Sequence, residues 1–173
     1  MNNISASEKA IRVNLAAAYQ LAALKGWGDG IYTHISACIP DEKNTYLINQ
    51  FGLRFDEITP ENLVKVNLQG EIISGVGPVN KSGFAIHGAV HSARQDAFCV
   101  MHLHVDSVVA ISTRNEGLLP ISQHALRFYR DLATHSYQGL ALSATEQKEL
   151  TTDRKSTRLN SSHIPLSRMP SSA

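Results

Sequence analysis

The 173-residue chain has only two cysteines, and other features that would narrow its function are also scarce. Cys38 and Cys99 both lie in apolar runs, so we interpret them as buried hydrophobic residues of a reducing compartment, not as a disulfide framework. With 16 basic and 15 acidic residues, the net charge of +1 indicates neither a nucleic-acid surface nor a polybasic membrane patch. The N-terminus lacks an apolar signal core, and no segment is long enough to span a bilayer. These absences predict a cytoplasmic protein with neither nucleic acid nor membrane as a partner.

Hydrophobic residues make up 43% of the chain, which is enough for the buried core of one domain. A first helix is predicted after Ser5, which fits a capping box with Glu8, and Gly26 is expected to end it. Residues 31–39 alternate with a period of two, which is typical of a strand. Further short strands are expected at residues 45–49, 63–68 and 71–74, the last two joined through a hairpin-like break at Gln69-Gly70.

Helices and strands continue to alternate along the rest of the chain. Thr59-Pro60-Glu61 has the composition of a short helix start, and residues 81–95 return to helical spacing. A strand is predicted at 97–105, followed by a helix that Asp106 caps and Gly117 ends. Another strand is expected at 118–122, and a capping box at Ser143 opens a last helix. This alternation predicts a layered α/β domain.

Residues 154–173 break this pattern. The segment RKSTRLNSSHIPLSRMPSSA has many serines, several basic residues, no acid and no sustained period. One interpretation is a disordered C-terminal tail. The interpretation that we favour is that residues 1–153 form the domain, incomplete at its C-terminal end, and that residues 154–173 are foreign cloning or adapter sequence.

Two histidines near the end of the apolar run CVMHLHV carry the clearest chemical signal. On a strand, His102 and His104 point to the same side, about 7 Å apart at their backbones. Two neutral imidazoles that face one space bind a divalent ion, and zinc suits them best. A short H-x-H motif also fits two half-buried, hydrogen-bonded histidines or a subunit interface. His87 and His91, four residues apart, could also chelate, although a polar stripe on a helix is the commoner explanation.

Several segments together resemble the class II aldolase/adducin family, in its N-terminal, aldolase-like domain. IHGAVHSARQDAFCVMHLHVDSVVAIS matches that family's helix, its ARPD-like turn and its strand ending in H-x-H. YTHIS, LINQFGLRFDEITPENLVKVNLQGEII and LLPISQHALRFY follow in the family's order, and the match covers Glu8 to Leu150. The resemblance implies a three-layer α/β/α domain around a largely antiparallel sheet, usually a homotetramer with sites at subunit boundaries.

In the sugar-phosphate aldolases of the family, three histidines hold zinc and a glutamate moves the proton as an enediolate forms. The metal acts as a Lewis acid that stabilises the developing charge on oxygen. The resemblance therefore implies that His102 and His104 are ligands of zinc or another divalent metal. It places the third histidine before a glycine in a later segment that this chain lacks, because His163 has no such context. The chain as given is therefore expected to bind metal poorly and to be inactive.

The chain departs from the aldolase branch at the proton-transfer positions. The glutamate position falls on Gly83, which can neither take nor give a proton. A proton-donating tyrosine falls on His124 and a phosphate-binding asparagine on His34, so these two histidines become the candidate acid/base groups. Gly52, Ser82 and Ser36 match substrate-binding positions of the family. Lys81 replaces a serine there and would add a cation to an anion site.

Two functions follow from the resemblance. The first is a divalent-metal-dependent carbon–carbon lyase, of aldolase or decarboxylase type, acting on a small oxygenated anion. The second is a non-catalytic, adducin-like assembly module, because the segment NKSGFAIHGAVH is similar to the adducin-like branch. Gly83 favours the module, whereas the intact pair His102 and His104 favours the enzyme.

Overall fold

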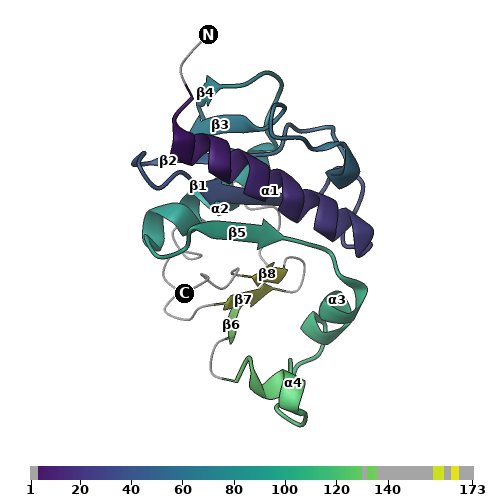
Figure 1. The fold of residues 1–173 in the computed structure, drawn as a ribbon. Helices are drawn as coiled ribbons and strands as arrows, with labels where there is room; N and C mark the ends of the chain where they lie inside the picture. The colour runs from purple at the N-terminus through teal and green to yellow at the C-terminus, as the bar shows by residue number, and fades with distance from the viewer. Residues whose placement is uncertain (1–3, 130–131, 136–157, 162–164, 168–173) are drawn as a thin grey trace.

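The computed structural model describes residues 4–129, 132–135, 158–161 and 165–167, drawn in colour in Figure 1. Within these residues, eight strands form one sheet in the order β4-β3-β2-β1-β5-β8-β7-β6. Neighbouring strands are antiparallel except for β6 and β7, which run parallel. The strands are β1 (His34–Cys38), β2 (Thr45–Ile48), β3 (Val64–Asn67), β4 (Ile72–Ser74), β5 (Cys99–His102), β6 (Leu132–His135), β7 (Arg158–Ser161) and β8 (Pro165–Ser167).

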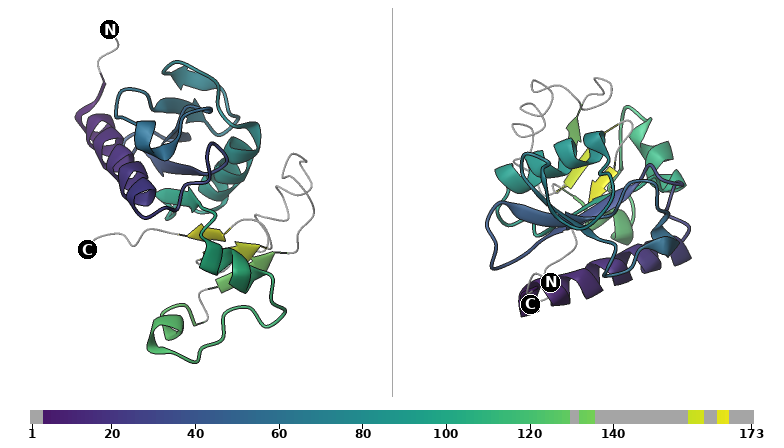
Figure 2. Two further views of the ribbon diagram at one scale, coloured as in Figure 1. Left: turned by 90° about the vertical axis from the view of Figure 1, so that its right-hand side faces the viewer. Right: turned by 90° about the horizontal axis from the view of Figure 1, so that it is seen from above.

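Helices lie on both faces of this sheet, which confirms the predicted three-layer α/β/α class (Figures 1 and 2). The helices are α1 (Ala6–Leu24), the 3₁₀ turn η1 (Phe55–Glu57), α2 (Lys81–Ala93), α3 (Asp106–Ser112) and α4 (Gln123–Leu126). Tyr19 of α1 packs with Ile35 and Met101 in the main core, between α1 and the sheet. Val64 and Val66 belong to a smaller cluster around Tyr46, whose hydroxyl donates to a carbonyl of α2.

Helix α1 begins and ends as predicted. The Ser5 hydroxyl accepts from the Glu8 backbone N–H, and Gly26 follows the C-cap with a positive φ of 69°. The predicted capping box is only half correct, because the Glu8 carboxylate turns inward to Arg12 and Lys65. A buried carboxylate is stabilised by charged partners more than by one backbone N–H, so the ion pairs take Glu8 away from the cap.

An ion cluster formed by Glu8, Arg12, Lys65 and Glu42 ties α1 to strand β3. Glu8 is 2% exposed and lies 2.8 Å from Arg12 and 2.7 Å from the Lys65 ammonium. Arg12 also donates to two backbone carbonyls, at 3.1 and 2.8 Å, and Lys65 contacts Glu42 at 2.9 Å. Each buried charge therefore has several partners, which is the condition for burying an ion.

Four local predictions are wrong. Residues 60–62 form a turn rather than a helix, because Asn62 accepts from the Thr59 N–H and donates to the Glu57 carbonyl. Asp106 is the first residue of α3 and makes no capping bond. The same helix ends at Ser112, well before Gly117.

The fourth of these predictions concerns residues 118–122, which form no strand. Ser122 instead caps α4 by accepting from the Ala125 N–H at 3.1 Å. Ile121 is 84% exposed, so this segment buries no apolar face that would hold it in the sheet.

Some predictions lie outside the described residues, among them the helix at Ser143, the boundary at Asp153 and His163. The two cysteines are free, as predicted, although both are half-buried rather than fully buried. In the part of the chain that the structure describes, no helix is long and apolar enough to cross a membrane.

Candidate metal centre

Strands β1 and β5 are neighbours, and their antiparallel register places His34 directly opposite His102. Alternation along β1 turns His34 and Ser36 toward α2, while Ile35 joins the core beneath α1. In the same way, Met101 of β5 joins that core, as the period-two pattern predicts. Pairing of these two central strands therefore gathers the histidines on the α2 side of the sheet.

His104 lies two residues beyond the end of β5, where its ring meets that of His102. The Nε2 atoms of the two rings are 3.1 Å apart. An ion bound at about 2.0–2.1 Å from each nitrogen fits between atoms at this separation. His104 Nδ1 donates to an Asp29 carboxylate oxygen at 2.7 Å, and His102 Nδ1 lies 2.9 Å from His34 Nε2. Both outer nitrogens thus have partners, as metal-binding histidines generally do.

His102 and His104 fit two positions of a zinc site. A catalytic zinc takes three protein ligands and keeps one open position. Among residues whose placement is described, no group of three or more His, Cys, Asp or Glu residues could hold an ion. The described site therefore supplies two ligands and no third.

Burial keeps the inner histidines uncharged. Burial, with a smaller contribution from the nearby His104, lowers the pKa of His34 to about 3. Burial also holds the pKa of His102 well below its ordinary value, with contributions from His34 and His104. A neutral imidazole is the form that binds metal, so His102 is ready to act as a ligand at neutral pH.

Helix α2 contributes two more histidines, which sequence periodicity assigns to a polar stripe. That prediction is wrong, because His87 is 0% and His91 is 7% exposed. His87 contacts His34 at 2.9 Å and the Ser36 hydroxyl at 2.6 Å. His91 contacts the same hydroxyl at 2.8 Å and the Ala97 carbonyl at 2.9 Å. The two α2 histidines are thus hydrogen-bonded beneath the helix and do not form a separate chelating pair.

Gly83, at the position of the aldolase glutamate, lies against the His34 ring. A Cβ atom at Gly83 would be 2.8 Å from His34 Nε2, closer than real Cβ contacts come. His34 cannot swing aside easily, because both of its nitrogens are hydrogen-bonded. The imidazole therefore occupies the space that any side chain at position 83 would need.

The remaining predicted site residues differ in their exposure to solvent. Ser36 is 0% exposed and already bonded to two histidines, so it does not present its hydroxyl to a substrate. Lys81 is exposed at the start of α2. Gly52 is exposed with a φ of 99°, next to Phe51, whose N–H donates to the Pro78 carbonyl. The Ser82 side chain lies outside the part of the chain that the structure describes.

His34 and His124 occupy positions that differ from those of a substrate-contacting acid/base pair. His34 is 2% exposed and its two nitrogens contact His87 and His102, so its ring is not open to a substrate. His124 is exposed on α4, which lies away from α2 and β5 in both Figures 1 and 2. The described chain does not bring these two histidines together.

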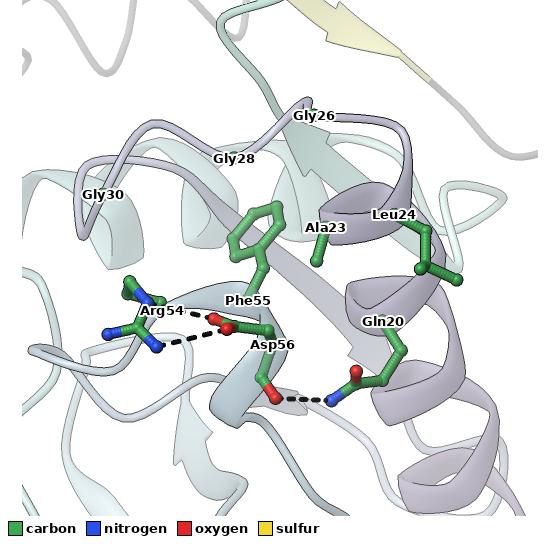
Figure 3. Close-up of a pocket in the computed structure, with 9 residues that line it drawn as sticks. All are labelled: Gln20, Ala23, Leu24, Gly26, Gly28, Gly30, Arg54, Phe55 and Asp56. Atoms are coloured by element: carbon green, nitrogen blue, oxygen red, sulfur yellow. Dashed lines mark hydrogen bonds and ion pairs between the residues drawn. The ribbon is translucent and has the colours of Figure 1, made fainter.

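A pocket of about 580 Å³ opens beside His104. Its lining includes Asp29, His104, Asp106, Val109 and Ala110. An adjoining pocket of about 310 Å³ shares Gly26 and Gly28 with it. Arg54 lines this second pocket, and its guanidinium points to the Asp56 carboxylate, to which it donates two hydrogen bonds of 3.1 Å (Figure 3). The pocket beside His104 is the one that adjoins the metal pair, and its lining, among the described residues, includes two carboxylates, of Asp29 and Asp106, and no lysine or arginine.

Sequence reasoning missed Asp29, which orients His104. Its one signal is an acidic residue between two glycines, just before the strand that carries His34. Antiparallel pairing of β1 with β5 brings the approach to β1 beside the end of β5. The strand order is needed to see this proximity, and local sequence patterns do not provide it.

Residues 13–165 match the Class II Aldolase and Adducin N-terminal domain. The chain belongs to this family. A crystal structure of an aldolase II superfamily protein from Pseudomonas syringae is 44% identical, with a TM-score of 0.92, and covers 96% of this chain and 68% of that chain. L-fuculose 1-phosphate aldolase from Glaciozyma antarctica is 25% identical, with a TM-score of 0.83, over 97% of this chain and 67% of that one.

The same family includes adducins. Mouse alpha-adducin is 44% identical over 144 residues, which are 81% of this chain and 19% of that protein. A class 2 aldolase protein of Caulobacter vibrioides is 50% identical over 151 residues, 87% of this chain. This chain spans 59% of that bacterial relative's length, so the relative has segments with no counterpart here.

Proposed function

We propose that this class II aldolase/adducin domain belongs to a divalent-metal-dependent carbon–carbon lyase, of aldolase or decarboxylase type, whose substrate is a small oxygenated anion. The observation that carries the proposal is the pair of Nε2 atoms of His102 and His104, 3.1 Å apart. The similarity to L-fuculose 1-phosphate aldolase supports the same reaction class. Zinc is the expected metal, because imidazole ligands suit it.

In this mechanism His102 and His104 hold the metal, together with a third ligand from outside the described residues. A bound divalent ion supplies the Lewis acid that stabilises negative charge on a substrate oxygen. Asp29 holds the His104 ring in place, and His34 does the same for His102. The pocket beside His104 receives the substrate. Lys81, exposed at the start of α2, is the candidate cation for an anionic substrate.

The lyase proposal predicts zinc-dependent cleavage of a carbon–carbon bond. Protein expressed from its complete gene would be stripped of metal, reloaded with zinc, and assayed on a panel that begins with L-fuculose 1-phosphate. We expect activity to fall to background in His102→Ala and His104→Ala, because each variant removes a ligand. Arg114→Ala, an exposed change after α3, should retain it. Zinc-loaded, folded protein with no activity on phosphorylated sugars or on carboxylic acids would contradict the proposal.

A second candidate is a non-catalytic, adducin-like assembly module that forms homo-oligomers. The space filled by His34 at Gly83 favours it, because no carboxylate fits there beside the imidazole. The identity to mouse alpha-adducin is consistent with it. An exposed apolar stripe on α1, formed by Val13, Leu21 and Leu24 with exposures of 53%, 60% and 82%, offers a surface for self-association.

A further inference from the structure

The histidines behind the metal pair form one continuous chain of hydrogen bonds. It starts at a backbone carbonyl and ends at a metal-binding ring. Its members, in order, are the Ala97 carbonyl, His91, Ser36, His87, His34 and His102. Each link measures between 2.6 and 2.9 Å. Such a chain can run in either of two directions, since every imidazole and hydroxyl both donates and accepts.

The carbonyl at one end selects the direction. His91 Nδ1 lies 2.9 Å from the Ala97 carbonyl oxygen and 3.1 Å from Cys38 Sγ. The carbonyl oxygen only accepts, and the thiol is a weak donor that can also accept, so His91 Nδ1 carries the proton that bonds to Ala97. In a neutral ring, His91 Nε2 then accepts, and the donor is the Ser36 hydroxyl. Because that hydroxyl has one proton, its oxygen accepts from His87 Nδ1. The direction of three hydrogen bonds follows from one carbonyl.

The same logic continues to the metal pair. His87 Nε2 is left without a proton and accepts from His34 Nδ1. His34 Nε2 is then an acceptor, and its donor is His102 Nδ1. His102 therefore presents a bare Nε2 lone pair. At the other side, the Asp29 carboxylate accepts from His104 Nδ1, which leaves His104 Nε2 bare as well.

We propose that this buried chain is a tautomer relay: the Ala97 carbonyl, through His91, Ser36, His87 and His34, fixes the His102 proton on Nδ1 and so presents its Nε2 as a metal ligand. The proposal rests on the metal site of the proposed function and adds positioning residues to it. Reversal of the chain would place a proton on His102 Nε2, and a protonated nitrogen cannot bind a metal.

The relay accounts for the replacement of two family positions together. His34 adds the link between α2 and His102, and Gly83 leaves the room that its ring requires. Asparagine at position 34 has a shorter side chain, so the link from His87 to His102 would be lost. In the relay, His34 and Gly83 therefore share a structural role beside the metal pair.

The direct test is nitrogen-15 NMR of the histidine rings in the metal-free 173-residue chain, with His102→Ala used to assign the His102 signals. We expect all five rings, His34, His87, His91, His102 and His104, to carry their proton on Nδ1. A proton on Nε2 of His102 would overturn the relay. This readout does not depend on metal. If the protein expressed from its complete gene binds no zinc while His102 shows the Nδ1 proton, the proposed function is disproved and the relay stands.

The matched variants are Ser36→Ala and Tyr46→Phe, each of which removes one hydroxyl beneath α2. Ser36→Ala breaks the chain of hydrogen bonds, so the links from His87 to His102 can take either direction. His102 should then become a mixture of tautomers, and the affinity of the protein for zinc should fall about tenfold. Tyr46→Phe should leave both properties at the wild-type value. Equal tautomers and equal affinities in the two variants would overturn the proposal.

Discussion

Acidification from about pH 7 to about pH 4.5 is expected to lower the free energy of unfolding by about 5 kcal/mol. His34 and His102 are held neutral in the folded state, with the pKa of His34 lowered to about 3 and that of His102 also lowered. In the unfolded chain both titrate near the ordinary histidine pKa of 6.5. Below about pH 6.5 the unfolded state therefore binds more protons, so stability is full above that pKa and falls as the pH decreases.

The size of this effect follows from two groups, each contributing up to about 1.4 kcal/mol per pH unit. Urea unfolding at several pH values, with a chelator present, measures it. Above about pH 4.5 the carboxylates stay mostly ionised, so the change in the free energy of unfolding comes from the histidines. Glu8, whose pKa is lowered by Lys65 and Arg12 in spite of its burial, loses its own contribution only below that range.

A variant of the exposed His124, such as His124→Ala, should show the wild-type pH dependence, because its ring lies on the surface of α4. His34→Asn should show a clearly smaller dependence, because one of the two neutral histidines is gone. An unfolding free energy that stays constant between about pH 7 and about pH 5 would show that the histidines are not buried as described.

Glu8→Ala should lower the free energy of unfolding by about 3–5 kcal/mol, measured by urea unfolding near neutral pH. The carboxylate is 3% exposed and is the contact shared by Arg12 and Lys65. Its removal leaves two cations near each other with one negative partner fewer. We expect the loss in the free energy of unfolding to lie near the lower end of this range, because Lys65 keeps its contact with Glu42 and Arg12 keeps its carbonyl acceptors.

Asp56→Asn is the matched control, since Asp56 also pairs with an arginine but at the exposed surface. Solvent screens such pairs, so the change should be small. Comparing the unfolding free energies of Glu8→Ala and Asp56→Asn shows how much of the effect comes from losing a buried carboxylate rather than any carboxylate paired with an arginine. Equal destabilisation by both would show that the cluster between α1 and β3 is not a buried ion network.

The sequence predicts those parts of the fold in which one local pattern decides the outcome. The alternation in residues 31–39 places Ile35 and His34 on opposite faces, and the structure confirms both faces. Ser5 and Gly26 mark the ends of α1, because caps depend on a few adjacent residues. Comparison with known proteins then confirms the family and the layered class.

The features that the sequence does not predict depend on contacts between distant segments. Helical spacing assigns His87 and His91 to a polar stripe, yet β1 offers Ser36 and His34 to the same side, so both histidines are buried. Their links join residues more than 50 positions apart. Glu8 likewise has the spacing of a capping residue but finds Lys65. Local patterns indicate polarity, and only the packing shows which polar groups meet.

The most direct test of the metal site is elemental analysis of the protein expressed from its complete gene, alongside His102→Ala and His104→Ala. We expect about one zinc or similar divalent ion per chain in the wild type, and loss of the metal in both variants, since each ligand is needed. Circular dichroism would confirm that all three proteins are folded. A folded wild-type protein without bound metal, even after zinc is added, would contradict the account and leave the adducin-like assembly module as the function.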